Sequence, residues 1–182
     1  MADSDFDLRA LYDALDEQRR SRRMSWAAAA REINGFKTGG HPIATSTITG
    51  LKHKAVAEGD GVLQMLLWLG RTPESFVPGI QDAPAERFRL RKLEESQIHR
   101  WDTKALHSAL NSQRQANGLT WTEVALQVGG FTPGMLMNLA KGGRIGFPGV
   151  MRIVRWLCQP AVAFITPRTG RSHPSSRPGD DA

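Results

Sequence analysis

The sequence has a single cysteine, Cys158, in 182 residues. An intrachain disulfide is therefore impossible and a cysteine-rich metal site is excluded; we expect Cys158 to be a small buried hydrophobic residue. The five histidines are scattered, with no pair at a spacing of four and no carboxylate at ligand spacing, which argues against a metal site. The phosphate-loop, G-x-S-x-G and HExxH motifs are also missing. We therefore expect no metal, no cofactor and no enzymatic activity.

Long apolar runs are missing as well. No stretch approaches the roughly 20 residues that a membrane-spanning helix requires. The chain starts with MADSDFDL, which is acidic and lacks the basic-then-apolar order of a signal peptide. These absences predict a cytoplasmic protein without a membrane partner.

Acidic residues are too few to balance the basic ones. The formal net charge is +6, which favours a polyanionic partner. Residues 1–78 carry ten basic and ten acidic side chains, whereas residues 79–182 carry fourteen and eight. The second part of the chain therefore supplies the whole excess of positive charge.

Helical periodicity runs through the first part of the chain. In the first predicted helix, Leu8, Leu11 and Leu15 form one apolar stripe after a cap at Asp7. The second begins after a cap at Ser25 and ends at Gly35, which we expect to be a left-handed cap. The predicted helices span residues 7–23, 26–33, 45–53 and 62–69.

A cluster of arginines closes the first predicted helix: Arg19, Arg20, Arg22 and Arg23. The helix dipole favours cations near a helix C-terminus, so a solvated helix end explains them. A contact with a nucleic-acid phosphate is the alternative.

Most of this pattern recurs later in the chain, which indicates an internal duplication. Before the predicted turn, matching residues lie 95 positions apart: Asp7 and Asp102, Leu11 and Leu106, Gln18 and Gln113, Arg19 and Arg114, Trp26 and Trp121. After the turn they lie 88 apart: Leu51 and Leu139, Gly61 and Gly149, Trp68 and Trp156. The difference is a seven-residue insertion around residues 37–43. We expect the repeated tryptophans to pack in the core rather than to stack on bases.

These patterns predict an all-α fold made of two tandem helix-turn-helix bundles. The first bundle is expected over residues 1–78 and the second over 98–166, with a connector at 79–97. Residues 167–182 are rich in proline, serine, glycine and charge, and we expect them to form a disordered tail.

A helix-turn-helix unit holds its second helix away from the core so that this helix can enter a DNA major groove. The first helix needs a small residue at the crossing, the turn needs a permissive residue, and the second helix needs an apolar inner side. The two copies supply small residues at Ala29 or Ala30 and at Ala125, turn residues at Gly35 and Gly130, and inward residues at Ile48, Leu51, Leu136 and Leu139. In the second copy, Thr132 and Pro133 form a favoured helix start.

Each copy resembles the phage-repressor/Cro-like (XRE-type) helix-turn-helix domain. The resemblance covers residues 7–77 and 102–165. It rests on ALDEQRRSRRMSWAAAAREI with IATSTITGLKHK, and on ALNSQRQANGLTWTEVALQVGGFTPGMLMNLAKG. The segments GVLQMLLWLG and GVMRIVRWLC match the fourth helix of the family. The resemblance implies double-stranded DNA binding, although members of this family also act as protein-interaction modules.

The resemblance also places the side chains that would contact DNA. Base-contacting positions fall on Thr45, Ser46, Thr47 and Gly50 in the first copy, and on Pro133, Gly134, Met135 and Asn138 in the second. Only Asn138 is of a base-reading type, and none is Arg or Gln, so we expect weak base discrimination. Thr49 joins the same outward face. Phosphate contacts are expected from Lys52, His53, Lys54, Lys141 and Arg144.

Two functions remain open at this point. The first is a DNA-binding transcriptional regulator in which the two copies act as a covalent pseudo-dimer over two half-sites about one helical turn apart. The second is a protein-interaction module that kept the fold and lost base readout, with Met135 and Met137 as contact residues because methionine suits adaptable surfaces. The sequence specifies no operator, effector or oligomeric state.

Overall fold

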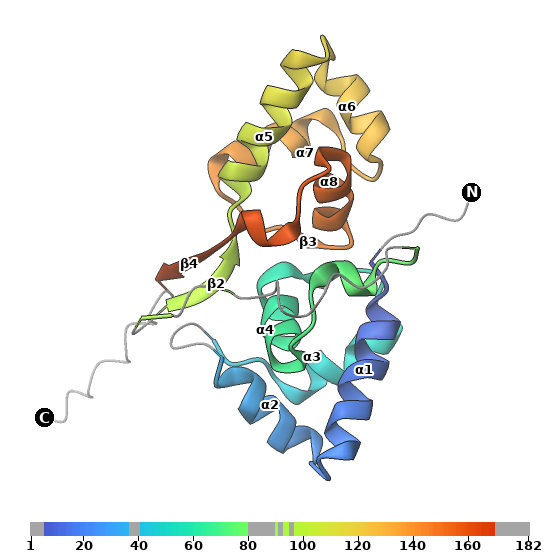
Figure 1. Ribbon diagram of the computed structural model, residues 1–182, viewed down its shortest axis with the longest axis vertical. Coiled ribbons are helices and arrows are strands. Elements are labelled where there is room, and N and C mark those ends of the chain that lie inside the picture. The colour runs from blue at the N-terminus through green and yellow to red at the C-terminus, as the bar shows by residue number, and fades with distance from the viewer. Residues whose placement is uncertain (1–5, 37–40, 80–89, 91–92, 95–96, 170–182) are drawn as a thin grey trace, which may run out of the picture.

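The computed structural model describes residues 6–36, 41–79, 90, 93–94 and 97–169. These residues form eight α-helices and four short strands, so the mostly helical character is confirmed. The strands make two small antiparallel sheets, which the expectation of an all-α fold did not include. Figure 1 shows the helices in two groups, one above the other, with β2 and β4 beside the junction.

The first helical group lies between Phe6 and Gly79. Its elements are α1 (Leu8–Ser21), α2 (Trp26–Asn34), α3 (Thr45–Thr49), the 3₁₀-helix η1 (Gly50–His53), α4 (Gly59–Leu69) and the 3₁₀-helix η2 (Pro73–Phe76). The third predicted helix is therefore an α-helical turn that tightens into a 3₁₀-helix. The fourth begins three residues before its predicted start at Val62.

The second helical group lies between Trp101 and Ile165. Its elements are α5 (Thr103–Ala116), α6 (Trp121–Val128), α7 (Pro133–Asn138), the 3₁₀-helix η4 (Leu139–Lys141), α8 (Gly149–Leu157) and the 3₁₀-helix η5 (Ala161–Phe164). Thr132 caps α7 by accepting a hydrogen bond from the Met135 amide, and Pro133 fills the first helical position, both as predicted.

The two sheets lie outside the predicted helices. Strand β1 (Ala57–Glu58) pairs with β3 (Gly146–Phe147), and β2 (Gln97–Trp101) pairs with β4 (Ile165–Thr169). The prediction of a disordered tail from residue 167 is wrong for residues 167–169, because these complete β4. Residues 170–182 lie outside the described part of the chain, as do 80–89, 91–92 and 95–96 of the predicted connector.

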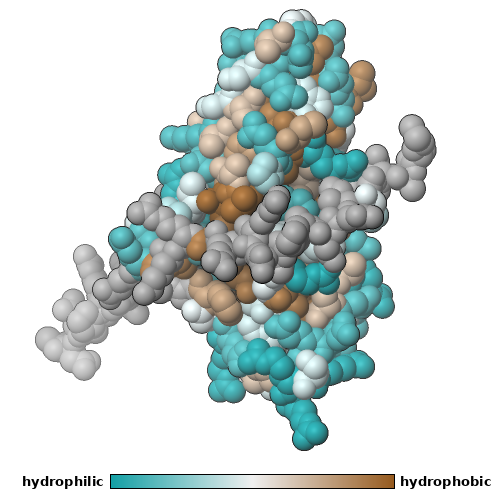
Figure 2. Space-filling view, viewed as in Figure 1, coloured by the Kyte–Doolittle hydropathy of each residue, from teal (hydrophilic) through white to brown (hydrophobic). Residues whose placement is uncertain are grey.

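One continuous hydrophobic core joins the two groups. Phe147 is completely buried, with its ring centroid 4.4 Å from Phe6 and 5.6 Å from Trp101. The Glu74 carboxylate also accepts a 2.6 Å hydrogen bond from the Ala161 amide across the junction. Figure 2 shows hydrophobic side chains around the middle of the molecule, between ends that are mostly hydrophilic. The two groups are therefore packed together rather than tethered.

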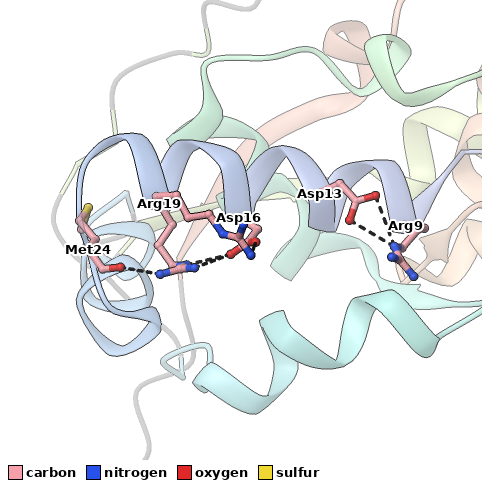
Figure 3. Close-up of polar contacts among 6 residues, drawn as sticks. Arg9, Asp13, Asp16, Arg19 and Met24 are labelled. Carbon is pink, nitrogen blue, oxygen red and sulfur yellow. Dashed lines mark hydrogen bonds and ion pairs between the residues drawn. The ribbon is translucent and has the colours of Figure 1, made fainter.

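Matching residues of the two groups make matching contacts at the ends of α1 and α5. Arg19 pairs with Asp16 at 2.6 Å and donates to the Met24 carbonyl at 2.8 Å (Figure 3). Arg114 likewise donates to the Asn111 amide oxygen and to the Leu119 carbonyl, the latter at 2.8 Å. Each arginine thereby fixes the turn into the next helix, which favours a structural role for Arg19 over a phosphate contact.

The tryptophans also occupy matching places. Trp68 is buried, whereas Trp26, Trp121 and Trp156 are half-buried, and all four pack on the core or belong to it. Gln18 donates to the Trp68 carbonyl at 2.8 Å, and Gln113 donates to the Trp156 carbonyl at 3.0 Å. The expectation that the tryptophans pack rather than project for base stacking agrees with these contacts.

Two local predictions are wrong. Gly35 has a φ of −67°, an ordinary helical value, so it is not a left-handed cap. Cys158 is exposed instead of buried, because it follows the last residue of α8 and takes the left-handed cap conformation itself, with a φ of 51°. At Gly130, the predicted turn residue of the second copy, φ is 72°, which favours glycine.

Candidate nucleic-acid interface

The segment α3–η1 carries a polar outer face on an apolar base. Ile48 and Leu51 are buried at 0% and 1% exposure, as predicted, and they attach the segment to the core. Opposite them, the exposed side chains are Ser46, Thr47, Lys52, His53 and Lys54, with Thr45 and Thr49 half-buried beside them. The structure thus brings seven of the ten predicted DNA-contacting residues together on one short segment.

Several of these side chains contact their own segment or the neighbouring α1. The Thr49 hydroxyl donates to the Thr45 carbonyl at 3.2 Å, so Thr49 is partly used within the helix. Lys52 Nζ lies 5.8 Å from the centroid of the Tyr12 ring on α1. A Cβ placed on Gly50 would lie 3.5 Å from Lys54 Cε, so the Lys54 stem passes over the bare backbone of Gly50. The outer face therefore offers small hydroxyl groups flanked by exposed cationic side chains.

Asn34 fixes the entry to this segment, a role that its position at a predicted helix end did not indicate. Its side-chain Nδ2 donates to the Ile43 carbonyl at 3.0 Å, and its Oδ1 accepts from the Ile43 amide at 2.7 Å. The two bonds close the turn between α2 and α3, whose residues 37–40 lie outside the described part of the chain. A turn made longer by the predicted insertion is thus closed at its base by one amide side chain.

A polar cluster ties α2 to α4 behind the segment. The Trp68 indole N–H donates to Glu32 at 2.9 Å, and Arg22 forms an ion pair with the same carboxylate at 2.6 Å. The hydrogen bond from Trp68, followed by that from Arg22, holds the pKa of Glu32 below its ordinary value. In the second group, Trp156 donates to Gln127 at 2.9 Å, so a neutral side chain takes the same place.

This difference gives a prediction about acid stability. Because the folded state favours the charged form of Glu32, the carboxylate stabilises the protein above the ordinary glutamate pKa of 4.5, and this contribution is lost as the pH falls through the lower pKa of the folded state. Glu32→Gln should keep the hydrogen bond to Trp68, as Gln127 does in the second group, and should make the fall of Tm below pH 4.5 shallower. Thermal denaturation across this range tests it; a Tm profile identical in shape to that of the unmodified protein would contradict it.

The corresponding surface of the second group is apolar. Met135 and Met137 on α7 are 50% and 46% exposed, and Leu126 on the neighbouring α6 is 83% exposed. Asn138 is exposed at the end of the same helix. The two groups therefore present chemically different surfaces at matching places, with hydroxyl and basic groups on one and methionine on the other.

The remaining two predicted residues lie elsewhere. Lys141 and Arg144 line a cleft between the two groups, together with residues of α4 and α5. Arg144 pairs with Glu58 of β1 at 2.8 Å, and both side chains are more than half exposed. Such an exposed pair contributes about 0–1 kcal/mol, so Arg144 can exchange this partner for another anion. The assignment of Lys141 and Arg144 as DNA phosphate contacts stays a prediction.

Comparison with known proteins adds no further assignment. The chain matches no protein-family profile, no curated protein and no solved structure. Among the described residues, no three His, Cys, Asp or Glu side chains gather closely enough to hold a metal ion. None of the helices in the described ranges combines the length and the apolar character needed to span a bilayer.

Proposed function

We propose that this protein is a DNA-binding transcriptional regulator built from two tandem phage-repressor/Cro-like helix-turn-helix domains. The observation that carries the proposal is the α3–η1 segment, which is fixed by buried Ile48 and Leu51 and turns hydroxyl and basic side chains outward. A short helix held in this way on a second helix is what entry into a major groove requires. The resemblance of the sequence to the family is the second support.

Repeated contacts support an internal duplication. Asp7 and Asp102 each accept from the amide three residues ahead, and their own amides donate to the carbonyls of Phe76 and Phe164, both at 2.8 Å. The donors and acceptors of these contacts correspond between the two groups at the offset of 95 or 88 residues. Two unrelated bundles have no reason to share these contacts.

The pairing of β1 with β3 supports a two-fold relation between the copies. Adding the offset of 88 to Glu58 gives Gly146, and these two residues face each other in the sheet. Ala57 faces Phe147, and their counterparts Ile145 and Gly59 share a 3.0 Å backbone hydrogen bond. This exchange of partners is the mark of a contact about a two-fold axis. A covalent pseudo-dimer of this kind suits two half-sites on one duplex.

Affinity in this proposal comes mainly from phosphates. Lys52, His53 and Lys54 supply phosphate contacts, and Thr45, Ser46 and Thr47 touch base edges with weak discrimination. Asn138 is the base-reading side chain of the second copy. Binding should therefore be strongly salt-dependent and only modestly sequence-specific.

The apolar surface of the second copy favours an alternative function. Met135 and Met137 are exposed on α7, the counterpart of α3, and Leu126 is exposed on the neighbouring α6; methionine suits contact with a protein. In this alternative the protein is a regulatory interaction module that no longer binds DNA. A combined arrangement, with one copy on DNA and the other on a protein, needs no change in either surface.

Alanine substitution of Lys52 and Lys54 together tests the DNA proposal. The double variant should bind duplex DNA about tenfold more weakly, since charge-assisted contacts are lost. The slope of log affinity against log salt should become shallower by about two, because about one counterion is released for each phosphate contact. The measurement is fluorescence anisotropy with labelled duplex DNA at several salt concentrations.

The matched control removes the same charge outside the segment. Arg9→Ala with Arg155→Ala takes two exposed cations from α1 and α8. This control should change the affinity by less than about twofold. Equal losses in the two double variants would show that net charge, rather than α3–η1, determines binding, and unchanged affinity in the lysine variant would remove both lysines from the interface.

A further inference from the structure

A cleft of about 590 Å³ lies between the two helical groups. Its walls come from the start of α4, from β2, from the start of α5 and from the loop after η4. Its volume falls within the roughly 300–1,000 Å³ that is usual for small-molecule sites. Since both groups contribute to the lining, a molecule in this cleft touches both at once.

The charges of the lining leave two cations without a counterion. The carboxylates are Glu58, Asp60 and Asp102, and the cations are Arg100, Lys104, Lys141, Arg144 and Arg168. Each carboxylate is paired with an arginine, at distances of 2.8, 2.7 and 3.1 Å in that order. Lys104 and Lys141 have no ion-pair partner within the described ranges, so the excess of two positive charges rests on them.

These two lysines belong to one small structure at the edge of the cleft. A Cβ placed on Gly142 would lie 2.9 Å from Lys104 Cε, so the Lys104 stem crosses the residue next to Lys141. The Thr103 hydroxyl donates to the Gly143 carbonyl at 2.9 Å and joins this loop to the start of α5. The φ of +77° at Gly142 requires glycine there, which keeps the loop backbone bare. Lys104 and Lys141 therefore line the same edge of the cleft, one from the start of α5 and the other from the loop that Lys104 crosses.

Two helix N-termini add positive potential to the same cleft. Asp60 and Gly61 come from the first turn of α4, an eleven-residue helix, and Lys104 comes from the first turn of α5, a fourteen-residue helix. The partial positive charge at each N-terminus favours an anion. Helix N-termini alone define no site, but here they border a cleft that already carries unpaired lysines.

The wall of the cleft also contains two unsatisfied polar groups. Gln64 and Trp101 are only 2% and 6% exposed, and neither Gln64 Oε1 nor Trp101 Nε1 has a hydrogen-bond partner among the residues that the structure describes. Buried polar atoms without partners are uncommon in folded proteins, and such atoms mark places where a further molecule belongs. One is an acceptor and the other a donor, and both belong to residues that line the cleft.

We propose that this cleft is a binding site for a phosphate group, carried by a small phosphorylated molecule. Lys104 and Lys141 hold the phosphate, and the paired arginines at the rim add positive potential around it. A DNA backbone is the other source of the same chemistry. A small molecule fits better, because three carboxylates line the cleft and repel the closely spaced phosphates of a duplex, whereas a single phosphate needs only the two unpaired lysines of the lining.

Occupation of the cleft has a consequence that rests on the proposed DNA-binding function. The ligand bridges the two groups, so it stabilises one relative placement of α3–η1 and α7. A ligand changes the affinity at a second site only through such a difference between states. The molecule in the cleft is then an effector of DNA binding.

The test begins without DNA, so that its outcome is independent of the proposed function. Sodium pyrophosphate is titrated into the full chain and followed by calorimetry and by the amide signals of Lys104, Gly142 and Gly143. We expect saturable binding that weakens by about tenfold in Lys104→Ala and in Lys141→Ala. Lys52→Ala removes one lysine outside the cleft and should leave the pyrophosphate affinity within about twofold. Absence of saturable binding, or an equal loss in Lys52→Ala, overturns the proposal.

A second arm separates the two sources of phosphate. Duplex DNA is titrated into the same three variants, with and without pyrophosphate. DNA affinity that is lowered in Lys52→Ala but unchanged in the two cleft variants supports a site for a small molecule. DNA affinity that falls in both cleft variants, with pyrophosphate displacing the DNA, assigns the cleft to the DNA backbone and overturns the small-molecule site. If the wild-type chain binds pyrophosphate but no DNA, the cleft site stands and the proposed function fails.

Discussion

Phe147→Ala is expected to lower the free energy of unfolding by about 3–5 kcal/mol, the usual cost of removing a buried aromatic ring. Phe147 has no exposed surface and contacts Phe6 of the first group and Trp101 of the second. The substitution therefore empties the place where the two groups meet. The variant should unfold at a lower urea concentration than the wild-type chain, as followed by far-ultraviolet circular dichroism. A protease should also cleave the chain between the two groups faster in the variant than in the wild type.

Phe36→Ala is the matched control for that experiment. Phe36 is 42% exposed at the end of α2, so its removal creates no closed cavity. We expect a change within about 0.5 kcal/mol, as for most surface substitutions. Similar losses of stability in the two variants would contradict the account of Phe147 as the centre of the junction.

Gly59→Ala is expected to destabilise the protein by about 1–3 kcal/mol or more, because it overfills a closed site. A Cβ at this position would collide with the Ile145 carbonyl oxygen and would lie 2.7 Å from Trp101 Cδ1. The first of these atoms is backbone and belongs to the hydrogen bond that the Gly59 amide makes at 3.0 Å. The methyl group therefore has to push apart the backbone next to β1 and β3, the two strands that join the groups.

Gly61→Ala lies two residues farther along the same helix and should have the opposite effect. No atom lies within 4 Å of a Cβ placed there, so the methyl group enters open space. Alanine in a helix is favoured over glycine by about 0.5–1 kcal/mol, and the variant should be more stable by that amount. Chemical denaturation of the two variants side by side tests the pair; a loss of stability in both would mean that helix geometry, rather than close approach to Ile145, makes glycine necessary.

The helices could be predicted from the sequence because their determinants are local. The leucine stripe of α1 and the caps at Asp7 and Ser25 depend on residues within a few positions, and all are present in the structure. The wrong assignment of Cys158 has a local cause as well. It follows an apolar helix in the sequence, but the chain turns there with a positive φ, which leaves the side chain outside.

The strands could not be predicted in the same way. β1 and β3 have two residues each and carry no alternation of their own, because their pairing depends on the placement of one helical group against the other. β4 includes Pro167, and its residues 167–169 look in the sequence like the start of an irregular tail. Pairing between residues far apart in the chain is set by tertiary packing rather than by a local pattern.

Of the two candidate sites, one could be predicted from local sequence spacing and the other could not. The outward face of α3–η1 followed from helical spacing, since Ile48 and Leu51 define the inner side and leave Ser46, Thr47 and Lys52 outside. The cleft could not be predicted from helical spacing, because its two unpaired lysines come from different elements, α5 and η4. Sequence spacing gave no indication that Lys104 crosses the residue beside Lys141. A site formed by contact between two groups requires the structure.

Titration of the wild-type chain with duplex DNA at several salt concentrations decides most directly whether the protein binds DNA. The titration uses genomic fragments and random-sequence duplexes, both at low salt and at increasing ionic strength. We expect the chain to bind genomic fragments and random-sequence duplexes at low salt, with a modest preference for some genomic fragments. The logarithm of the affinity should fall linearly with the logarithm of the salt concentration. Absence of binding to every duplex at low salt would contradict the proposed DNA binding and favour the interaction module that exposes Met135 and Met137.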